Sequence, residues 1–304
     1  MSVASLDFSI LQDKIRGLQG DVQYDTLELF EKVLKSSPSS DIAQQTRNFV
    51  TPILASFSNA KELYGETELS FALETYDAFL LISTCIPSGH YAQDVLAGAL
   101  PLLEQQGKMW NMWEFKRLVR GIWNNDATSE VDVPDNNEER LSLGEWLNLN
   151  SFIAKCFENN IPQSSSVNAF INFALWEMRS ALEEPWYEEK DGTTVIPREA
   201  FDMKVRVACE WINLAGRALL VQCLRNCCED HPNGGNQGRP YGPGSLFQGR
   251  VGSGLERWGF WKRRLIEVKA IVGEEVHGPI DEALAKMKAV EAEVSEAFVA
   301  RITS

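Results

Sequence analysis

The chain has 304 residues and a formal net charge of −14 at pH 7, from 43 acidic and 29 basic residues. This acidic excess repels phosphate backbones and anionic lipid surfaces, so we expect no nucleic-acid partner and no membrane-surface partner. The sequence begins without a basic stretch followed by an apolar core, and no apolar run is long enough to span a bilayer. We therefore expect a soluble, cytoplasmic globular protein.

Apolar residues recur with helical spacing through most of the chain, and no segment alternates strictly enough to predict a strand. The pattern predicts an all-α fold. In the first half we expect helices at 6–17, 21–35, 41–63, 66–86, 88–105 and 110–123. Pro52 and Pro101 fall inside two of these segments, where a proline kinks or breaks a helix because it lacks the backbone N–H.

The second half begins with a loop. Residues 124–140 are acidic, polar and without apolar spacing, which is typical of a linker. Further helices are expected at 141–159, 164–184, 197–228, 255–272 and 279–302. Between them, residues 231–254 are rich in Gly and Pro but contain no phosphate-binding glycine motif, which favours a lid or a surface loop.

Two of these helices are expected at the centre of the fold. The 164–184 helix carries a wide apolar stripe, and the 197–228 helix is apolar on two sides, one beginning at Val205 and the other at Val207. A helix that is apolar on two sides is normally covered on both. We therefore predict a single compact multi-helix domain over residues 1–304, with these two helices buried.

A polar row interrupts the 197–228 helix. Arg206, Glu210, Asn213 and Arg217 share one face. If that face is buried, Arg206, Glu210 and Arg217 become candidate catalytic groups, and Asn213 becomes a candidate substrate-binding group. If the face is exposed, the row is the solvated side of the helix.

Aromatic residues are abundant, with nine Trp, fifteen Phe and six Tyr. Such residues can wall a hydrophobic ligand site, and Trp favours pockets where its N–H finds a partner. The candidate wall consists of Trp211, Tyr76, Trp258 and Trp261. Core packing explains the same residues, and amphipathic packing explains the stretch 255–265.

No metal or cofactor site is expected. Cys227, Cys228 and His231 lie close together, but a structural zinc site needs four well-spaced ligands. The chain also lacks the serine-hydrolase elbow, the kinase signatures and the dinucleotide fingerprint. Common hydrolase, kinase and dehydrogenase functions are therefore not indicated.

Two segments carry a family resemblance. LYGETELSFALETYDAFLLIS at 63–83 and LERWGFWKRRL at 255–265 resemble the Tyr-Gly and Glu-Arg-Trp-x-x-Trp-Lys segments of filamentous-fungal helical proteins described as a domain of unknown function. The chain also looks like the cofactor-free hetero-Diels–Alderases of tropolone sesquiterpenoid biosynthesis. No catalytic residue can be matched to that group position by position.

The resemblance implies an enzyme of fungal secondary metabolism that joins a tropolone quinone methide to a humulene-type sesquiterpene. Such a cyclase needs no cofactor, because it orients two hydrophobic reactants and hydrogen-bonds one carbonyl. Formation of the quinone methide by loss of water would also need an acid or a base. The alternatives are a non-catalytic protein that binds a hydrophobic ligand or serves as a scaffold, and a helical protein with an unrelated hydrolytic activity. A homodimer is left open.

Overall fold

The computed structural model describes residues 21–36, 41–123, 141–159, 170–185, 197–225 and 241–303, together with Leu6, Phe8, Ser9, Leu11 and Gln12. Helices occupy most of these residues and none of them lies in a strand, which confirms the prediction of an all-α fold. The described helices fall into two compact units, α2 to α8 and α9 to α12. The prediction of one domain over residues 1–304 stays a prediction.

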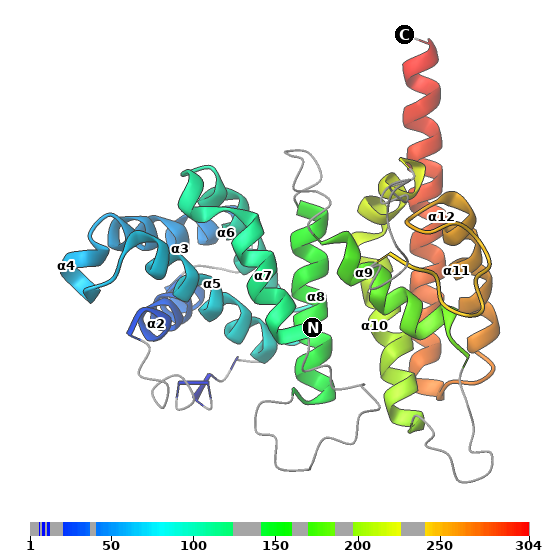
Figure 1. The fold of residues 1–304 in the computed structure, drawn as a ribbon, viewed down its shortest axis with the longest axis horizontal. Coiled ribbons are helices and arrows are strands. Elements are labelled where there is room, and N and C mark those ends of the chain that lie inside the picture. The colour runs from blue at the N-terminus through cyan, green and yellow to red at the C-terminus, as the bar shows by residue number, and fades with distance from the viewer. Residues whose placement is uncertain are drawn as a thin grey trace. The chain divides into compact units, whose positions relative to one another are not determined.

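The helices of the first unit are, in chain order, α2 (Asp21–Ser36), α3 (Ile42–Phe57), α4 (Ala60–Tyr64), α5 (Glu68–Cys85), α6 (Ala92–Glu104), the 3₁₀ turn η1 (Lys108–Trp110), α7 (Met112–Trp123) and α8 (Leu143–Asn159) (Figure 1).

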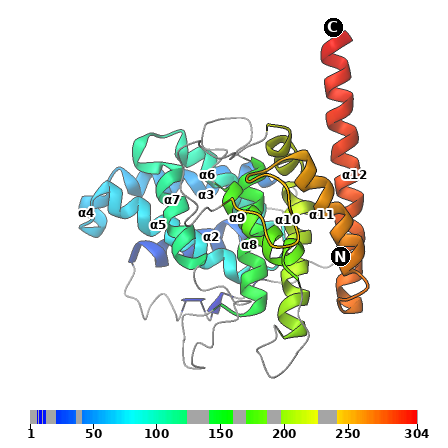
Figure 2. The same cartoon turned by 45° about the vertical axis from the view of Figure 1, so that its right-hand side comes forward.

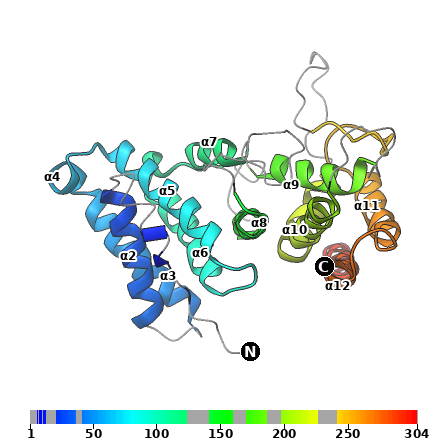
Figure 3. The ribbon, with the colours of Figure 1, turned by 90° about the horizontal axis from the view of Figure 1, so that it is seen from below.

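The centre of this unit is α5, which packs against α2, α7 and α8. Figure 3 shows α2 and α3 side by side next to it. Phe30 of α2, Phe49 of α3 and Phe79 of α5 form a fully buried row, with ring centroids 5.0 and 5.4 Å apart. Buried aromatic rings of this kind contribute large apolar areas to a core. Sequence analysis did not single out α5 as a central helix.

The helix expected over 41–63 is interrupted in the structure. Pro52 lies inside α3 without ending it, and the break comes at Ser58 and Asn59 instead. Both side chains hydrogen-bond backbone carbonyls of the preceding turn, at 3.1 Å for Ser58 Oγ and 2.9 Å for Asn59 Nδ2. Such bonds compete with the helix ladder. Pro101 likewise lies inside α6, where a break was one of the expectations.

The second unit contains α9 (Ile171–Met178), the π-helical turn η3 (Arg179–Glu183), α10 (Arg198–Leu224), α11 (Leu255–Val268) and α12 (Glu274–Thr303). Helix α10 packs against α9, η3, α11 and α12, and both of its apolar sides are largely buried. The two helices predicted to be central are therefore buried. The last turns of α12 project beyond α10 and α11 (Figure 2).

Boundaries in the second unit differ from the expectations at two places. Helix α12 begins at Glu274, five residues before Pro279, and Asp202 of α10 accepts the Gly273 N–H just ahead of it, with N–O distances of 3.2 and 3.3 Å. Helix α11 begins at Leu255 as expected but ends at Val268, four residues before the expected end at 272.

The two predicted loops are described only in part. Residues 241–254 have no regular helix or strand, which agrees with a loop there, whereas 231–240 lie outside the described residues. The expected linker 124–140 also lies outside them. Among the helices that are described, α10 is long and apolar enough to cross a membrane by length and composition, but a buried core helix passes the same test.

Candidate functional site

The predicted polar row lies along α10, as its helical spacing required. Arg206 and Arg217 are exposed, while Glu210 and Asn213 are half-buried. None of the four residues lines either cavity described below. Exposed arginines are what a solvated helix face presents. The prediction that this row is catalytic stays a prediction.

The predicted aromatic residues are all buried, with at most 3% of each exposed. Trp211, Trp258 and Trp261 belong to the second unit, whereas Tyr76 lies on α5 of the first. The structure brings Trp258 and Trp261 together, with ring centroids 6.5 Å apart. Both of these indoles are bound to carboxylates, so their N–H groups are already engaged within the fold. Their prediction as substrate-binding residues stays a prediction.

The Glu-Arg-Trp-x-x-Trp-Lys segment has a clear structural role, which centres on Glu183. Arg257 donates from Nε to Glu183 Oε1 at 2.6 Å and from Nη2 to Oε2 at 3.0 Å. One helical turn later, Trp261 donates its indole N–H to Oε1 at 2.6 Å. The backbone N–H of Gly244 donates to Oε2 at 2.9 Å. Arg257 and Glu183 are 1% and 0% exposed, so this is a buried, bidentate and fully hydrogen-bonded ion pair.

The Arg257 guanidinium also hydrogen-bonds the backbone of the segment 241–254. Its remaining N–H groups donate to the backbone carbonyls of Tyr241, Gly242 and Gly252 at 2.6 to 3.2 Å. The backbone N–H of Leu246 donates to the Glu183 carbonyl at 2.9 Å. The irregular segment is therefore attached directly to the π-helical turn.

A second carboxylate binds the other half of the motif. Glu291 of α12 accepts from the Trp258 indole N–H at 2.8 Å and from the Lys262 ammonium at 2.6 Å. Arg257 and Trp261 thus bind Glu183, and Trp258 and Lys262 bind Glu291. All the charged and indole groups of the motif after its first residue are engaged in joining α11 to its neighbours.

A small cavity of about 360 Å³ lies where the segment 241–254 meets α11. Leu224, Phe247 and Leu255 contribute apolar surface to it, and Arg250 and Glu256 contribute opposite charges. Arg257 also lines it, but its guanidinium is committed to Glu183, and the volume is less than half that of the cavity described next. We do not consider it the main site.

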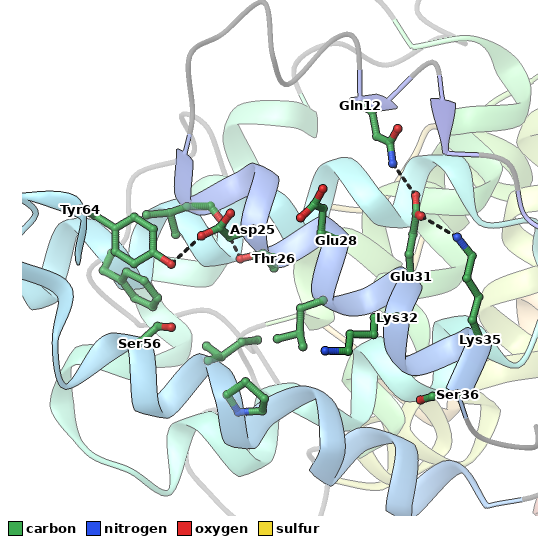
Figure 4. A pocket seen from close by; sticks show the side chains of 15 residues that line it. Gln12, Asp25, Thr26, Glu28, Glu31, Lys32, Lys35, Ser36, Ser56 and Tyr64 are labelled. Carbon is green, nitrogen blue, oxygen red and sulfur yellow. Dashed lines mark hydrogen bonds and ion pairs between the residues drawn. The ribbon is translucent and has the colours of Figure 1, made fainter.

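The larger cavity, of about 800 Å³, lies along α2 and α3 in the first unit (Figure 4). Its apolar lining consists of Val22, Leu29, Pro52, Ile53 and Phe71. Its polar lining consists of Gln12, Asp25, Thr26, Glu28, Glu31, Lys32, Lys35, Ser36, Ser56 and Tyr64. The volume falls within the roughly 300–1,000 Å³ usual for a small-molecule site. Ten of the fifteen lining residues are polar, and we call the five apolar ones the apolar floor.

The most distinctive polar group at the rim is a tyrosine–carboxylate pair. Tyr64, the last residue of α4, donates its hydroxyl proton to Asp25 Oδ2 of α2 at 2.8 Å. Burial and the hydrogen bond to Asp25 raise the pKa of Tyr64, so its hydroxyl stays protonated at neutral pH. Gly65 follows with a φ of 72°, a left-handed conformation that glycine adopts without steric cost and that ends α4 here. The Tyr-Gly motif therefore places this hydroxyl.

The charged residues farther along α2 differ in how they are held. Glu31 pairs with Lys35 at 3.0 Å and also accepts from Gln12 Nε2 at 2.9 Å. Lys32 makes no ion pair with a described residue, and Figure 4 shows its ammonium turned toward the space between α2 and α3. Among the labelled charged groups of this lining, Lys32 is thus a cation turned toward the cavity.

Sequence analysis missed Asp25, Lys32 and Tyr64. The Tyr-Gly motif was visible, but its partner is 39 residues away and on another helix, so spacing along the chain gave no signal. No group of three or more His, Cys, Asp or Glu residues within the described residues could hold a metal ion. Cys227, Cys228 and His231, considered above for zinc, lie outside them.

Comparisons with known proteins identify one family. Residues 76–265 match the model of a family described as a protein of unknown function, DUF3632. The match begins at Tyr76 and includes α11, while the residues that line the larger cavity precede it. No curated protein and no solved structure gives a significant match.

Proposed function

This chain belongs to the DUF3632 family, and from that premise we propose that it is a cofactor-independent cyclase of fungal secondary metabolism. It joins a tropolone quinone methide to a humulene-type sesquiterpene by a hetero-Diels–Alder reaction. The observation that carries the proposal is the α2–α3 cavity, which combines about 800 Å³ of space, an apolar floor and a tyrosine–carboxylate pair at its rim.

The apolar floor supports the binding of two hydrophobic reactants. Val22, Ile53 and Phe71 line the cavity and are each no more than 3% exposed, so the packing of the core holds them firmly in place behind it. Holding two reactants in a near-attack geometry contributes roughly 7–11 kcal/mol to lowering a barrier. The cycloaddition itself forms one C–C and one C–O bond and transfers no proton, so orientation is its main requirement.

The Tyr64–Asp25 pair supports the step that precedes the cycloaddition. A hydroxymethyl tropolone becomes a quinone methide when it loses one molecule of water. In our proposal the Asp25 carboxylate accepts the proton of the tropolone hydroxyl, and the Tyr64 hydroxyl protonates the leaving hydroxyl. Transfer of the proton from Asp25 to the Tyr64 oxygen returns the pair to its starting state, so water is the sole by-product.

The test is formation of cycloadduct by the purified full chain. A hydroxymethyl tropolone and a humulene-type alkene are incubated with the protein, and the adduct is quantified by chromatography and mass spectrometry. We expect Asp25→Asn and Tyr64→Phe to lower the initial rate at least tenfold. Glu62→Gln serves as the matched control, because Glu62 is an exposed carboxylate on α4 that does not line the cavity.

Two results would overturn the proposal. One is adduct formation no faster than with heat-denatured protein. The other is a wild-type rate in both Asp25→Asn and Tyr64→Phe, with melting temperatures that show the variants are folded.

One observation favours a second function, a protein that binds a hydrophobic ligand without transforming it. The Tyr64 hydroxyl and Asp25 already satisfy each other, so a structural hydrogen bond between the end of α4 and α2 is enough to explain the pair. For this function, the reactants raise the melting temperature of the chain but no adduct appears. Asp25→Asn then changes ligand affinity without changing any rate.

A further inference from the structure

A polar pair without acceptors lies within the aromatic core of the first unit. The hydroxyl of Tyr76 and the indole Nε1–H of Trp110 are both buried, and neither has a hydrogen-bond partner among the described residues. Tyr76 is 0% exposed and Trp110 is 1% exposed. Their rings contact each other edge to face, with centroids 5.5 Å apart. Two adjacent donors are thus left unsatisfied in one small region.

Such a pair costs stability. A buried donor without an acceptor loses its hydrogen bonds to water and gains nothing in return, so native proteins rarely keep one without a reason. Burial and the nearby charge of Glu104 raise the pKa of Tyr76 well above its ordinary value, so the hydroxyl carries its proton at any physiological pH. Both groups therefore remain donors.

The pair lies directly behind the wall of the α2–α3 cavity. Phe71 lines that cavity, and its ring centroid is 6.4 Å from the centroid of Trp110. Phe71 also contacts Tyr64, at 5.4 Å between ring centroids, which connects it to the tyrosine–carboxylate pair. Phe71 thus lies in contact with both the cavity and Trp110, and Trp110 in turn contacts Tyr76.

We propose that Tyr76 and Trp110 form an oxygen-binding site that receives the carbonyl of a hydrophobic ligand when Phe71 moves aside. The carbonyl oxygen has two lone pairs and can accept from both donors. For the identity of the ligand, this inference rests on the proposed function: the carbonyl is that of the tropolone ring. Two donors on that oxygen withdraw electron density from the heterodiene, which makes it a better acceptor in the cycloaddition.

The experiment follows the Trp110 indole directly. The full chain is labelled with ¹⁵N-tryptophan, and the signal of Trp110 is assigned from its loss in Trp110→Phe. Tropolone is the probe, and cycloheptatriene, which has the seven-membered ring without oxygen, is the matched control. We expect tropolone to move the Trp110 Nε1–H signal downfield and cycloheptatriene to leave it nearly unchanged. Trp258, whose Nε1–H is bound to Glu291 in the other unit, supplies an internal reference.

Two variants sharpen the test. Tyr76→Phe removes the hydroxyl alone, and we expect it to weaken tropolone binding about tenfold. Phe71→Leu replaces the aromatic ring between the cavity and Trp110 with a smaller side chain. We expect it to increase the shift of the Trp110 signal on addition of tropolone. If Tyr76→Phe does not fold, the response of the Trp110 signal to tropolone in Phe71→Leu tests the site.

Several results would overturn the inference. These are a Trp110 signal that ignores tropolone, an equal response to cycloheptatriene, wild-type affinity in Tyr76→Phe, or an unchanged response in Phe71→Leu. The site is also rejected if the wild-type protein does not bind tropolone and Tyr76→Phe folds but is less stable than wild type. In that case the Tyr76 hydroxyl donates to a bound water molecule and not to a ligand. Cycloadduct formation with an unresponsive Trp110 rejects this site alone. A responsive Trp110 without any adduct rejects the proposed reaction alone.

Discussion

The carboxyl groups whose pKa values are shifted by their surroundings shift in opposite directions in the two units. In the first unit, burial raises the pKa of Glu74, Asp77 and Glu104, and the neighbouring carboxyl of Glu66 raises that of Glu74 further. In the second unit, burial also tends to raise the pKa of Glu184 and Glu291, but hydrogen bonds and cationic partners outweigh it, so both values are lowered.

The opposite pKa shifts reflect different roles of the carboxylates in the two units. The second unit joins its elements through carboxylates, with Glu184 binding Arg179 and Ser245, and Glu291 binding Lys262 and Trp258. The first unit has carboxylate contacts of its own, such as Tyr64–Asp25, but its core is packed through aromatic rings and it keeps acids whose charged form burial disfavours. Acids whose pKa values are perturbed by burial gather at functional sites, which favours the first unit as the place of a ligand site.

The largest effect is expected when the buried ion pair of the second unit is broken. Arg257→Met leaves the Glu183 carboxylate buried without its guanidinium, so we expect the free energy of unfolding to fall by about 3–5 kcal/mol. Urea unfolding, followed by circular dichroism, measures the change. Arg263→Met is the control, because Arg263 is exposed on the same helix and its loss should change stability by less than about 0.5 kcal/mol. Equal stability of the two variants would show that the pair does not hold the unit together.

An intermediate effect is expected at Gly244, which approaches the π-helical turn closely. A Cβ at this position would lie 2.5 Å from the backbone oxygen of Glu183, so the segment or the turn must move. We expect Gly244→Ala to lower the free energy of unfolding by about 1–3 kcal/mol.

In the first unit, Gly121→Ala should have an effect of opposite sign on the free energy of unfolding. It should stabilise α7 by up to about 1 kcal/mol, since a Cβ at this position meets no described atom within 4 Å outside the backbone of its own helix. Thermal melting compares the two.

A smaller effect, of about 1 kcal/mol, is expected from Asp77→Asn in the first unit. The pKa of Asp77 is higher in the folded than in the unfolded chain, so the folded state binds more protons between the two values. Wild-type stability therefore falls as the pH rises through this window, which begins near the unfolded value of about 3.9. The variant should be more stable than wild type at pH 7 and equal to it at the lowest pH. Urea midpoints at both pH values test this, and a variant that is less stable at pH 7 contradicts it.

Helix spacing was enough to predict the all-α fold and the burial of α10, because apolar periodicity is a local signal. It did not predict the end of α3, where the side chains of Ser58 and Asn59 compete with the helix ladder. It also did not predict that Glu183 would bind Arg257, because the two residues are 74 positions apart. The Tyr64–Asp25 pair was missed for the same reason. A motif shows which residue types recur, whereas their partners depend on how distant helices pack.

The smallest effect is expected from Glu291→Gln, and its sign should be opposite to that of Asp77→Asn. Lys262 and Glu291 are about one-third exposed, at 36% and 35%, so solvent screens the pair and its loss should cost at most about 1 kcal/mol at pH 7. Because Lys262 and Trp258 lower the pKa of Glu291 in the folded state, its contribution is present above the unfolded value of about 4.3 and is lost as the pH falls through the folded value. The variant should therefore match the stability of wild type in strong acid, and also at neutral pH in 1 M salt, where the pair is screened further.

Glu293→Gln, an exposed change two residues away, controls for the loss of one negative charge on α12. If Glu291→Gln gains stability at pH 7 as Asp77→Asn is expected to do, burial and not pairing governs the carboxyls of both units, and the contrast between them fails.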